Sequence, residues 1–583
     1  MCFLRLLFPS FTLSTCFHKF TSKRRRSMNS TLSPKDRVWS GREIEGLIAE
    51  GRKIIILDGQ VIKADAWLPY HPGGDHAILH MVGRDGTDEI RALHSIETQA
   101  YMRKFVIGKI QGRWVNFLPP IQGGTFRPLT QDKEQEEEDI GCPLDNTSSS
   151  ASSSTPPSPI FDAIDAPVNK SMSISSASSV SEHELPPIST NLIETKLSAE
   201  RTSDLLKYPS LDYASQDQIV SKYRELDARI RAANLYKCPY WAYGIEACRY
   251  ILIFTSALIA LRYGYYALSG ALIGTFWHQL VFTAHDSAHI GITHIYHVDS
   301  CIAIFIADYL GGLSIGWWKR NHNVHHIVTN SPEHDPDIEH MPFFAISPKF
   351  FSSLRSTYYN RVMDFDIVAR WAVSIQHWLY YPILMLGRFN LYRLSWEYLF
   401  TGQAPRKGPA WFHLYLEIAG QFFFWAWYGY GIVYCSIPTA WDRFVFVMIS
   451  HMVTMPLHVQ ITLSHFAMST TDMGVHESFA QKMLRTTMDV DCPTWLDFFH
   501  GGLQFQAVHH LFPRIPRHNL RKAQKYVKEF CEDTGVPYVI YGFTEGNQKV
   551  ISRLGEVAKQ VKVFEECRKA CAREVVEGHG LAH

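Results

Sequence analysis

The chain has 583 residues, of which 46% are hydrophobic, and its formal net charge is +1. This length exceeds that of one ordinary domain, and a nearly neutral chain without a basic patch gives no reason to expect a nucleic-acid partner. The 11 cysteines include no C-x-x-C pair, which favours a reducing compartment over a disulfide scaffold.

The first 35 residues contain no Asp or Glu but several Lys and Arg. This composition is typical of a mitochondrial transit peptide. Met28, however, offers a second start shortly before a segment that predicts a folded domain. We therefore expect residues 1–35 to be a disordered leader or a mispredicted start, and not a targeting signal.

Residues 36–118 predict a small α+β domain. Within it, K-I-I-I-L-D-G-Q-V-I indicates two strands joined by a turn at Asp58-Gly59. The segment H-P-G-G-D-H follows, in which proline fixes the backbone and the two glycines allow close approach of a bulky flat ligand. A second candidate histidine comes 23 positions after the first, in A-L-H-S.

These two histidine segments resemble the cytochrome b5 family, apart from A-L where V-G often precedes the second histidine. The resemblance implies a haem b with two axial histidines, bound by His71, His94, Pro72, Gly73 and Gly74. Such a haem transfers electrons and has no open position on its iron. We therefore expect the neighbouring His76 and His80 to be surface or packing residues.

Residues 119–200 contain the acidic run E-Q-E-E-E-D and then Ser- and Pro-rich sequence. Few apolar residues predict a disordered linker. It is either a tether that keeps the haem domain at high concentration near its partner or an inert spacer.

Residues 201–545 predict an all-α membrane domain with a cytosolic helical cap. Four apolar stretches are long enough to span a bilayer, at about 246–262, 264–284, 411–435 and 441–463. The stretches 301–318 and 371–387 are interrupted, and we expect them to be interfacial or re-entrant. Residues 546–583 predict a C-terminal helical tail.

The distribution of charge predicts the topology. The loop between the last two spans carries only Asp442 and Arg443, whereas the segments around the histidine clusters carry Lys319, Arg320, Arg355, Arg361, Arg370, Arg388, Lys482, Arg485, Arg514 and Arg517. Positive residues stay cytosolic. With four spans, both termini, the haem domain and the histidine clusters lie on the cytosolic side.

Three histidine clusters flank these spans. They read H-D-S-A-H, H-N-V-H-H and Q-A-V-H-H, and a window such as H-x-x-H-H is expected by chance only about 0.06 times in this chain. Spacings of three and four place the side chains on one helical face, and imidazole is the commonest transition-metal ligand. The clusters therefore predict a metal site.

The haem-like domain narrows the choice of metal. Zinc needs no electrons, whereas non-haem iron that activates O₂ consumes them one at a time. The E-x-x-H pairs of carboxylate-bridged di-iron proteins are not present in the sequence. The residues thus indicate a histidine-rich iron site that receives electrons from an attached haem.

The three clusters behind a cytochrome b5-like domain resemble the front-end desaturases, in which the third cluster begins with Gln. The resemblance implies two non-haem iron ions that activate O₂, with the catalytic residues His285, His289, His322, His325, His326, Gln506, His509 and His510. The segments Y-H-P-G-G-D-H-A-I-L-H and H-D-P-D-I-E-H are most similar to fungal Δ8-(E)-sphingolipid desaturases. That similarity implies a ceramide or sphingoid substrate, NADH-cytochrome b5 reductase as electron donor, and the endoplasmic reticulum membrane.

Three alternatives remain open on the sequence alone. A b5-fused lipid hydroxylase would use a similar iron site to insert oxygen, but Gln506 and the 183 positions from His326 to His509 favour a desaturase. A front-end desaturase could instead act on a fatty acyl chain. A metal transporter would need polar residues inside its spans, and it leaves the haem motif unexplained.

A further ligand is expected outside the clusters. Two irons with about four protein ligands each require about eight, and the clusters provide seven histidines. The amide of Gln506 is a poorer donor than imidazole. The fourth span ends M-P-L-H-V-Q-I-T-L-S-H-F, where His458 and His465 differ in depth by roughly 10 Å. We predict that His465, at the cytosolic end, is a ligand and that His458 is not.

Overall fold

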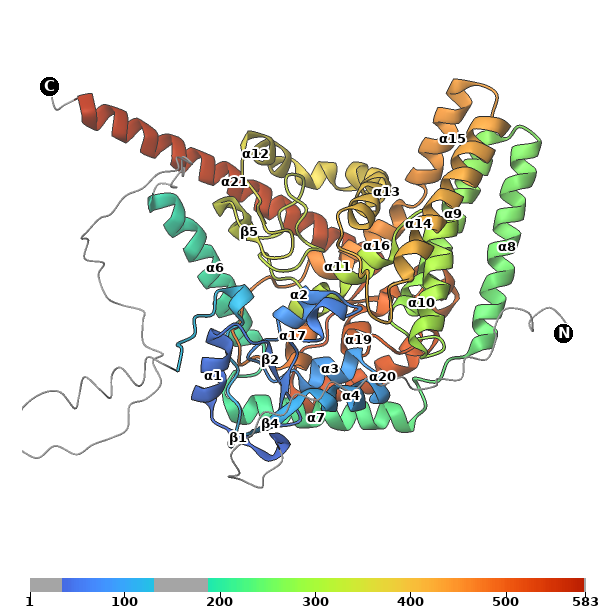
Figure 1. The fold of residues 1–583 in the computed structure, drawn as a ribbon. Helices are drawn as coiled ribbons and strands as arrows, with labels where there is room; N and C mark the ends of the chain where they lie inside the picture. Colours follow the sequence, from blue (N-terminus) through green and yellow to red (C-terminus); the bar gives the residue numbers. More distant parts are fainter. Residues whose placement is uncertain (1–33, 130–186, 581–583) are drawn as a thin grey trace, which may run out of the picture.

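The computed structural model describes residues 34–129 and 187–580 (Figure 1). The predicted leader lies outside these residues except for its last two positions. Figure 1 shows a small N-terminal domain, in blue, packed against one end of a larger helical domain. This arrangement agrees with the predicted fold class of a small α+β domain followed by an all-α domain.

The N-terminal domain is built on a four-stranded sheet in the order β1-β4-β3-β2. Its elements are η1 Pro34–Asp36, β1 Val38–Trp39, α1 Gly41–Ala49, β2 Ile54–Leu57, β3 Gln60–Lys63, η2 Leu68–Tyr70, α2 Asp75–Leu79, α3 Thr87–Leu93, α4 Ile96–Met102, η3 Arg103–Phe105, β4 Val106–Ile110 and η4 Pro120–Gln122. The predicted hairpin is confirmed as β2–β3. Asp58 (φ 51°) and Gly59 (φ 70°) both have positive φ, as a tight two-residue hairpin turn requires.

The predicted linker is shorter in the structure. Residues 119–129 belong to the first domain, because Phe126 packs on its core and the guanidinium Nε of Arg127 lies 3.1 Å from Glu45. Residues 187–200, also assigned to the linker, form the first part of helix α6 (Pro187–Lys207). Ile193 of α6 is buried in the core of the helical domain, which stabilises a helix that composition alone did not predict. The rest of the linker, 130–186, lies outside the described residues.

Further helices of the large domain follow α6 in chain order. They are α7 Tyr213–Ala232, α8 Tyr240–Arg262, α9 Tyr266–Ala288, α10 Tyr296–Ile304, the π-helix η5 Phe305–Leu310, α11 Ile315–Val328, η6 Pro348–Ser352, α12 Ile367–Ser374, α13 Gln376–Phe400, α14 His413–Phe424, the π-helix η7 Trp425–Ser436, α15 Ala440–Met452 and α16 Met455–Phe466. A short ribbon of β5 Arg355–Ser356 and β6 Arg361–Val362 lies between η6 and α12.

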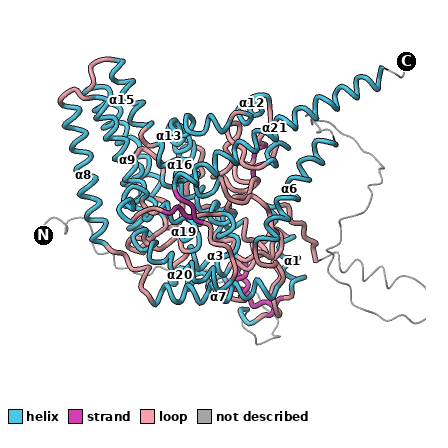
Figure 2. Tube along the Cα trace, turned by 180° about the vertical axis from the view of Figure 1, so that it is seen from behind, coloured by secondary structure: helices cyan, strands magenta, loops and turns pink. Residues whose placement is uncertain are grey.

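Two stretches of the described chain are long and apolar enough to cross a membrane, namely α8 and Ala440–Phe466, which joins α15 and α16. A third crossing is counted if Tyr296–Leu310 and Ile315–Val328, which meet at 118°, form one broken span. This break matches the interrupted stretch predicted at 301–318. Figures 1 and 2 show α8, α9 and α15 side by side, projecting away from the N-terminal domain. Ile251 and Leu252 on α8 are 66% and 67% exposed, as expected of a lipid-facing surface.

The remaining elements complete the helical domain. They are α17 Phe479–Thr486, β7 Asp489–Asp491, η8 Thr494–Leu496, α18 Asp497–His500, η9 Leu503–Phe505, α19 Gln506–Leu511, α20 Arg517–Thr534, β8 Ile540–Gly542 and α21 Phe543–Gly580. The helix predicted for the C-terminal region is confirmed over its described part. Its first half is not a tail, however, because Val550, Leu554 and Val557 are buried in the main core.

Candidate functional site

The N-terminal domain contains a slot between two histidine rings. His71 precedes α2 and His94 ends α3, and their ring centroids are 6.0 Å apart. In each ring Nδ1 lies near a backbone carbonyl oxygen, that of Gly74 at 2.7 Å and that of Ile90 at 3.1 Å. Because Nδ1 of each ring donates a hydrogen bond to this carbonyl oxygen, the lone pair on Nε2 is free to bind a metal. Since a metal–imidazole bond is about 2 Å long, this spacing fits one metal atom between two Nε2 atoms.

The pKa values of His71 and His94 also suit binding of a metal. Burial lowers the pKa of His94 to about 3, with a further contribution from His71, and burial also lowers the pKa of His71. Both rings are therefore neutral at physiological pH, the form that binds a metal. His80 is fully buried and hydrogen-bonds to Gln122 through Nδ1, which confirms it as a packing residue.

The H-P-G-G loop has a second close neighbour. A Cβ on Gly73 would lie 2.6 Å from the Nδ2 atom of Asn323, and one on Gly74 would lie 2.9 Å from the side chain of Arg320. Both neighbours are on α11, the helix that carries H-N-V-H-H. Arg320 also forms an ion pair of 2.7 Å with Asp75. The glycines thus allow contact with the second domain as well as with a flat ligand.

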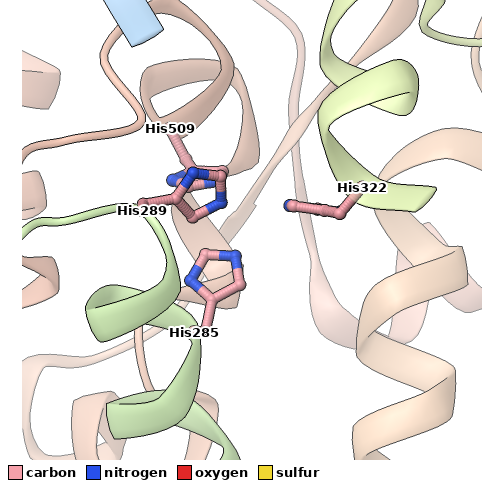
Figure 3. A group of neighbouring side chains, drawn as sticks. All are labelled: His285, His289, His322 and His509. Atoms are coloured by element: carbon pink, nitrogen blue, oxygen red, sulfur yellow. The ribbon is translucent and has the colours of Figure 1, made fainter. Parts of the chain in front are cut away.

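The first histidine group lies in the helical domain. It consists of His285 and His289 on α9, His322 on α11 and His509 on α19, with ligand nitrogens within 4.8 Å of one another. Figure 3 shows the four rings converging on one space. Nε2 of His289 and of His509 is buried and has no hydrogen-bond partner among the described residues. Unpaired buried nitrogens are costly, and a metal ion in this space would satisfy them.

A second group joins His325, His465 and His510, again with ligand atoms within 4.8 Å. They come from α11, α16 and α19 respectively. Nδ1 of His465 is buried and has no partner in the described chain. The structure therefore places His465 beside two of the cluster histidines. His458 belongs to no such group and lies against Gly387 of α13, 3.5 Å from its Cβ position.

His326 lies between the two groups. Its Nε2 is 3.1 Å from Nε2 of His322, and its ring centroid is 4.9 Å from that of His509 and 4.3 Å from that of His510. Gln506 is buried at the start of α19, three positions before His509. The cluster histidines thus form two neighbouring groups, with His326 between them, and a third candidate group of His322, His325 and Asp337 links the two.

Two acidic residues that sequence analysis left without a role lie beside these rings. Asp335 accepts a hydrogen bond from Nδ1 of His325 at 2.8 Å, and Asp337 lies 3.5 Å from Nδ1 of His322. Carboxylates bonded to the second ring nitrogen fix the tautomer and orientation of metal-binding histidines. The sequence signal that could have identified these two residues is the segment H-D-P-D-I-E-H, which resembles the fungal Δ8-(E)-sphingolipid desaturases.

Comparisons with known proteins assign both domains. Residues 263–542 match the model of the fatty acid desaturase family, and residues 42–111 match the cytochrome b5-like haem/steroid binding domain. A Delta 8-(E)-sphingolipid desaturase of Emericella nidulans is 61% identical over 93% of this chain and 98% of its own.

More distant relatives point the same way. A Delta 8-(E)-sphingolipid desaturase of Kluyveromyces lactis is 47% identical over 93% of this chain and 96% of its own. A Delta(8)-fatty-acid desaturase of Arabidopsis thaliana is 38% identical over 54% of this chain and 68% of its own. The chain therefore belongs to the Δ8-(E)-sphingolipid desaturases, a family of oxidoreductases that joins a cytochrome b5-like domain to a fatty acid desaturase domain.

Proposed function

We propose that this protein introduces a trans double bond at carbon 8 of the long-chain base of ceramide, using O₂ and electrons from its own haem domain. The observation that carries the proposal is the contact between the two sites: the loop after His71 packs on α11, the helix that contributes His322 and His325. A haem held by His71 would therefore lie close to a helix that would hold iron, as electron supply to the iron requires. The high identity to enzymes of that name supports the choice of substrate.

Two iron ions would bind at the two histidine groups. The first would be held by His285, His289, His322 and His509, the second by His325, His465 and His510, with His326 shared or assigned to either. When bound, iron supplies the activation of O₂ and the removal of hydrogen from an unactivated carbon. Gln506, buried three positions before His509, would take the family's variant position at the start of the third cluster.

The protein's own residues prepare this chemistry. Asp335 orients the imidazole of His325, so that Nε2 of this ring points away from the carboxylate toward His510. His289 and His509 are buried, whereas His285 and His322 are partly exposed, so the first group is shielded from water on one side only. Haem would be held by His71 and His94, with Pro72, Gly73 and Gly74 shaping the loop.

Four membrane spans are part of this proposal. Four spans would be α8, α9, α14 continued by η7, and α15 continued by α16, with the haem domain and both histidine groups on the cytosolic side. Arg and Lys in the segments around the histidines support this orientation. The endoplasmic reticulum, with NADH-cytochrome b5 reductase as electron donor, is the setting that fits a ceramide-modifying enzyme with a fused haem domain.

Lipid analysis tests the proposal. The gene is expressed in a host whose own Δ8 enzyme has been deleted, and the long-chain bases are analysed by mass spectrometry with location of the double bond. We expect bases that have lost two hydrogen atoms, with the new bond at carbon 8. A base that gains an oxygen atom supports the hydroxylase alternative, and unsaturation confined to the acyl chains supports a fatty-acyl desaturase.

A further inference from the structure

A cavity lies between the two domains, next to the first histidine group. Pro72 of the haem-binding loop forms part of its wall, and residues of α9, α10, α11, α13 and α14 form most of the rest. Among them, Ala288 directly precedes His289 on α9, and Lys319 precedes His322 by three positions on α11. The cavity therefore ends within about one helical turn of two ligands proposed for the first iron.

The wall of this cavity is mostly apolar. Ala303, Ile304 and Ile315 belong to its apolar part. The polar side chains that line it are those of Tyr296, Ser300, Lys319, Tyr398, His413 and Glu417. A largely apolar cavity in which a few polar groups converge is typical of a binding site for a small molecule.

Glu417 on α14 has one oxygen atom that the protein does not use. The residue is only 3% exposed. Its Oε2 atom accepts hydrogen bonds from the hydroxyl of Ser314 at 2.5 Å and from the backbone N–H of Gly316 at 3.1 Å. Its Oε1 atom has no donor among the described residues, and the hydroxyl of Tyr398, which is 4% exposed, has no hydrogen-bond partner there either.

These two unused groups converge on one point of the wall. A Cβ on Gly316 would lie 2.6 Å from Oε1 of Glu417 and 2.8 Å from the hydroxyl oxygen of Tyr398. Gly316 lines the same cavity. Buried polar atoms without partners are costly, so the carboxylate and the hydroxyl together indicate a ligand that brings hydrogen-bond donors to this point.

The other charged groups nearby have their own contacts. Asp308 accepts from Nε2 of Gln421 at 2.9 Å. Lys319 forms no ion pair among the described residues, and its Nζ lies 5.1 Å from the centre of the Tyr296 ring. Nε2 of His413 lies 3.3 Å from Nδ1 of a neighbouring histidine, His297. None of these groups supplies the donor that Glu417 lacks.

We propose that this cavity binds the polar end of the sphingoid substrate, with Glu417 and Tyr398 as hydrogen-bond partners of its hydroxyl and amide groups. The proposal rests on the function proposed above. A ceramide carries hydroxyl groups on carbons 1 and 3 of its long-chain base and an amide N–H on carbon 2, so three donors lie side by side. An ester-linked acyl chain offers only acceptor oxygens at that end. Glu417 would therefore select a ceramide over an acyl ester, a choice that the iron ligands do not make.

The place of the cavity also fits the position of the new double bond. Carbon 8 lies five carbon–carbon bonds beyond carbon 3, roughly 6 Å along an extended chain. One helical turn of α11, about 5 Å in length, separates Lys319 in the cavity wall from His322. A head group held in the cavity would therefore bring carbon 8 beside the first histidine group.

A single short helix separates the cavity from the lipid-facing surface. Tyr296 and Ala303 on α10 line the cavity, whereas Val298 on the same helix is 43% exposed. The neighbouring Ile295 is 59% exposed. Exposed apolar side chains on α10 suit contact with a bilayer, so a membrane lipid would reach the cavity past this helix.

Kinetics of the purified full-length holoenzyme on two matched substrates test the proposal. Ceramide is compared with its 1,3-di-O-methyl ether, which lacks both hydroxyl donors. Glu417→Gln and Tyr398→Phe are each compared with the same change at an exposed position, Glu397→Gln on α13 and Tyr415→Phe on α14. Because the N–H of Gly316 requires an acceptor, the amide nitrogen of the glutamine would take the place of Oε1 and turn an acceptor into a donor.

We expect the wild type and both controls to prefer ceramide over the ether by about 10- to 100-fold in kcat/KM. Glu417→Gln should lose most of this preference, and Tyr398→Phe should reduce it about two- to tenfold. In both variants the double bond should no longer be confined to carbon 8, because the head group is no longer held. Haem absorbance and iron content should stay at the wild-type level.

The possible failures are distinguishable. A wild-type enzyme that does not desaturate ceramide refutes the proposed function itself. If the wild type desaturates ceramide at carbon 8 while Glu417→Gln and Tyr398→Phe keep its preference and bond position, only the assignment of the cavity is overturned. An equal fall for ceramide and ether, or loss of haem from the variants but not from the controls, also overturns it. If Glu417→Gln does not fold, Tyr398→Phe, which removes one oxygen atom, decides by the same criteria.

Discussion

Replacement of His465 by alanine tests how the second iron would be held. His465 is one of three histidines in its group, and the other two, His325 and His510, come from α11 and α19. Two imidazoles do not retain an iron that needs about four protein ligands, so bound iron should fall from about two to about one per chain. The first group shares none of these three residues and should keep its ion.

The matched control is His458→Ala, on the same helix but in neither group. Both variants are purified as full-length protein, and iron is measured by mass spectrometry together with haem by absorbance. We expect His465→Ala to lose half its iron and all desaturase activity while haem absorbance is unchanged, and His458→Ala to keep its iron. Wild-type iron content in His465→Ala would remove that residue from the site, and equal losses in both variants would indicate damage to α16.

Other predictions address the neighbouring groups. His94→Ala should abolish haem absorbance and turnover while iron content is retained, and full activity would show that the fused domain is dispensable. Asp335→Asn should weaken iron binding about 10- to 100-fold, because the carboxylate orients His325; unchanged affinity in a metal-competition assay would contradict this role. Burial raises the pKa of Asp489 to about 6, so the folded state binds a proton that the unfolded state releases at about pH 4. Stability should therefore fall as pH rises from about 4 to about 6, and Asp489→Asn should flatten that dependence in thermal unfolding; an unaltered slope would refute the assignment.

Sequence reasoning predicted the parts of this fold that local chemistry determines. The hairpin β2–β3 follows from two short apolar runs on either side of an Asp-Gly turn. The cluster histidines follow from helical spacing, and the structure confirms that they lie on α9, α11 and α19. These features depend on residues that are close together in the chain, within one helical turn or one hairpin. Their spacing can be read directly from the sequence.

The features that could not be predicted from the sequence depend on contacts between segments that lie far apart in the chain. The division of the histidines into two groups requires α11, α16 and α19 to meet, and no spacing encodes that meeting. Asp335 acts on His325 only because the loop after α11 folds back. Residues 187–200 are too polar to fold alone, yet α6 is stabilised where Ile193 is buried in the core. The helix α9 was expected as a span at 264–284, but most of its side chains from Phe276 to Ala288 are enclosed by neighbouring helices, and that enclosure depends on contacts that the sequence does not display.

The most direct test of the central claim is turnover of the purified full-length enzyme with ceramide, NADH, cytochrome b5 reductase and ¹⁸O₂. The account predicts one NADH consumed for each double bond formed at carbon 8, with the labelled oxygen recovered only in water. It also predicts that oxidation of the reduced haem is fast only when ceramide is present. Labelled oxygen in the lipid product, or desaturation that proceeds at the wild-type rate in a His71→Ala variant without haem, would contradict it.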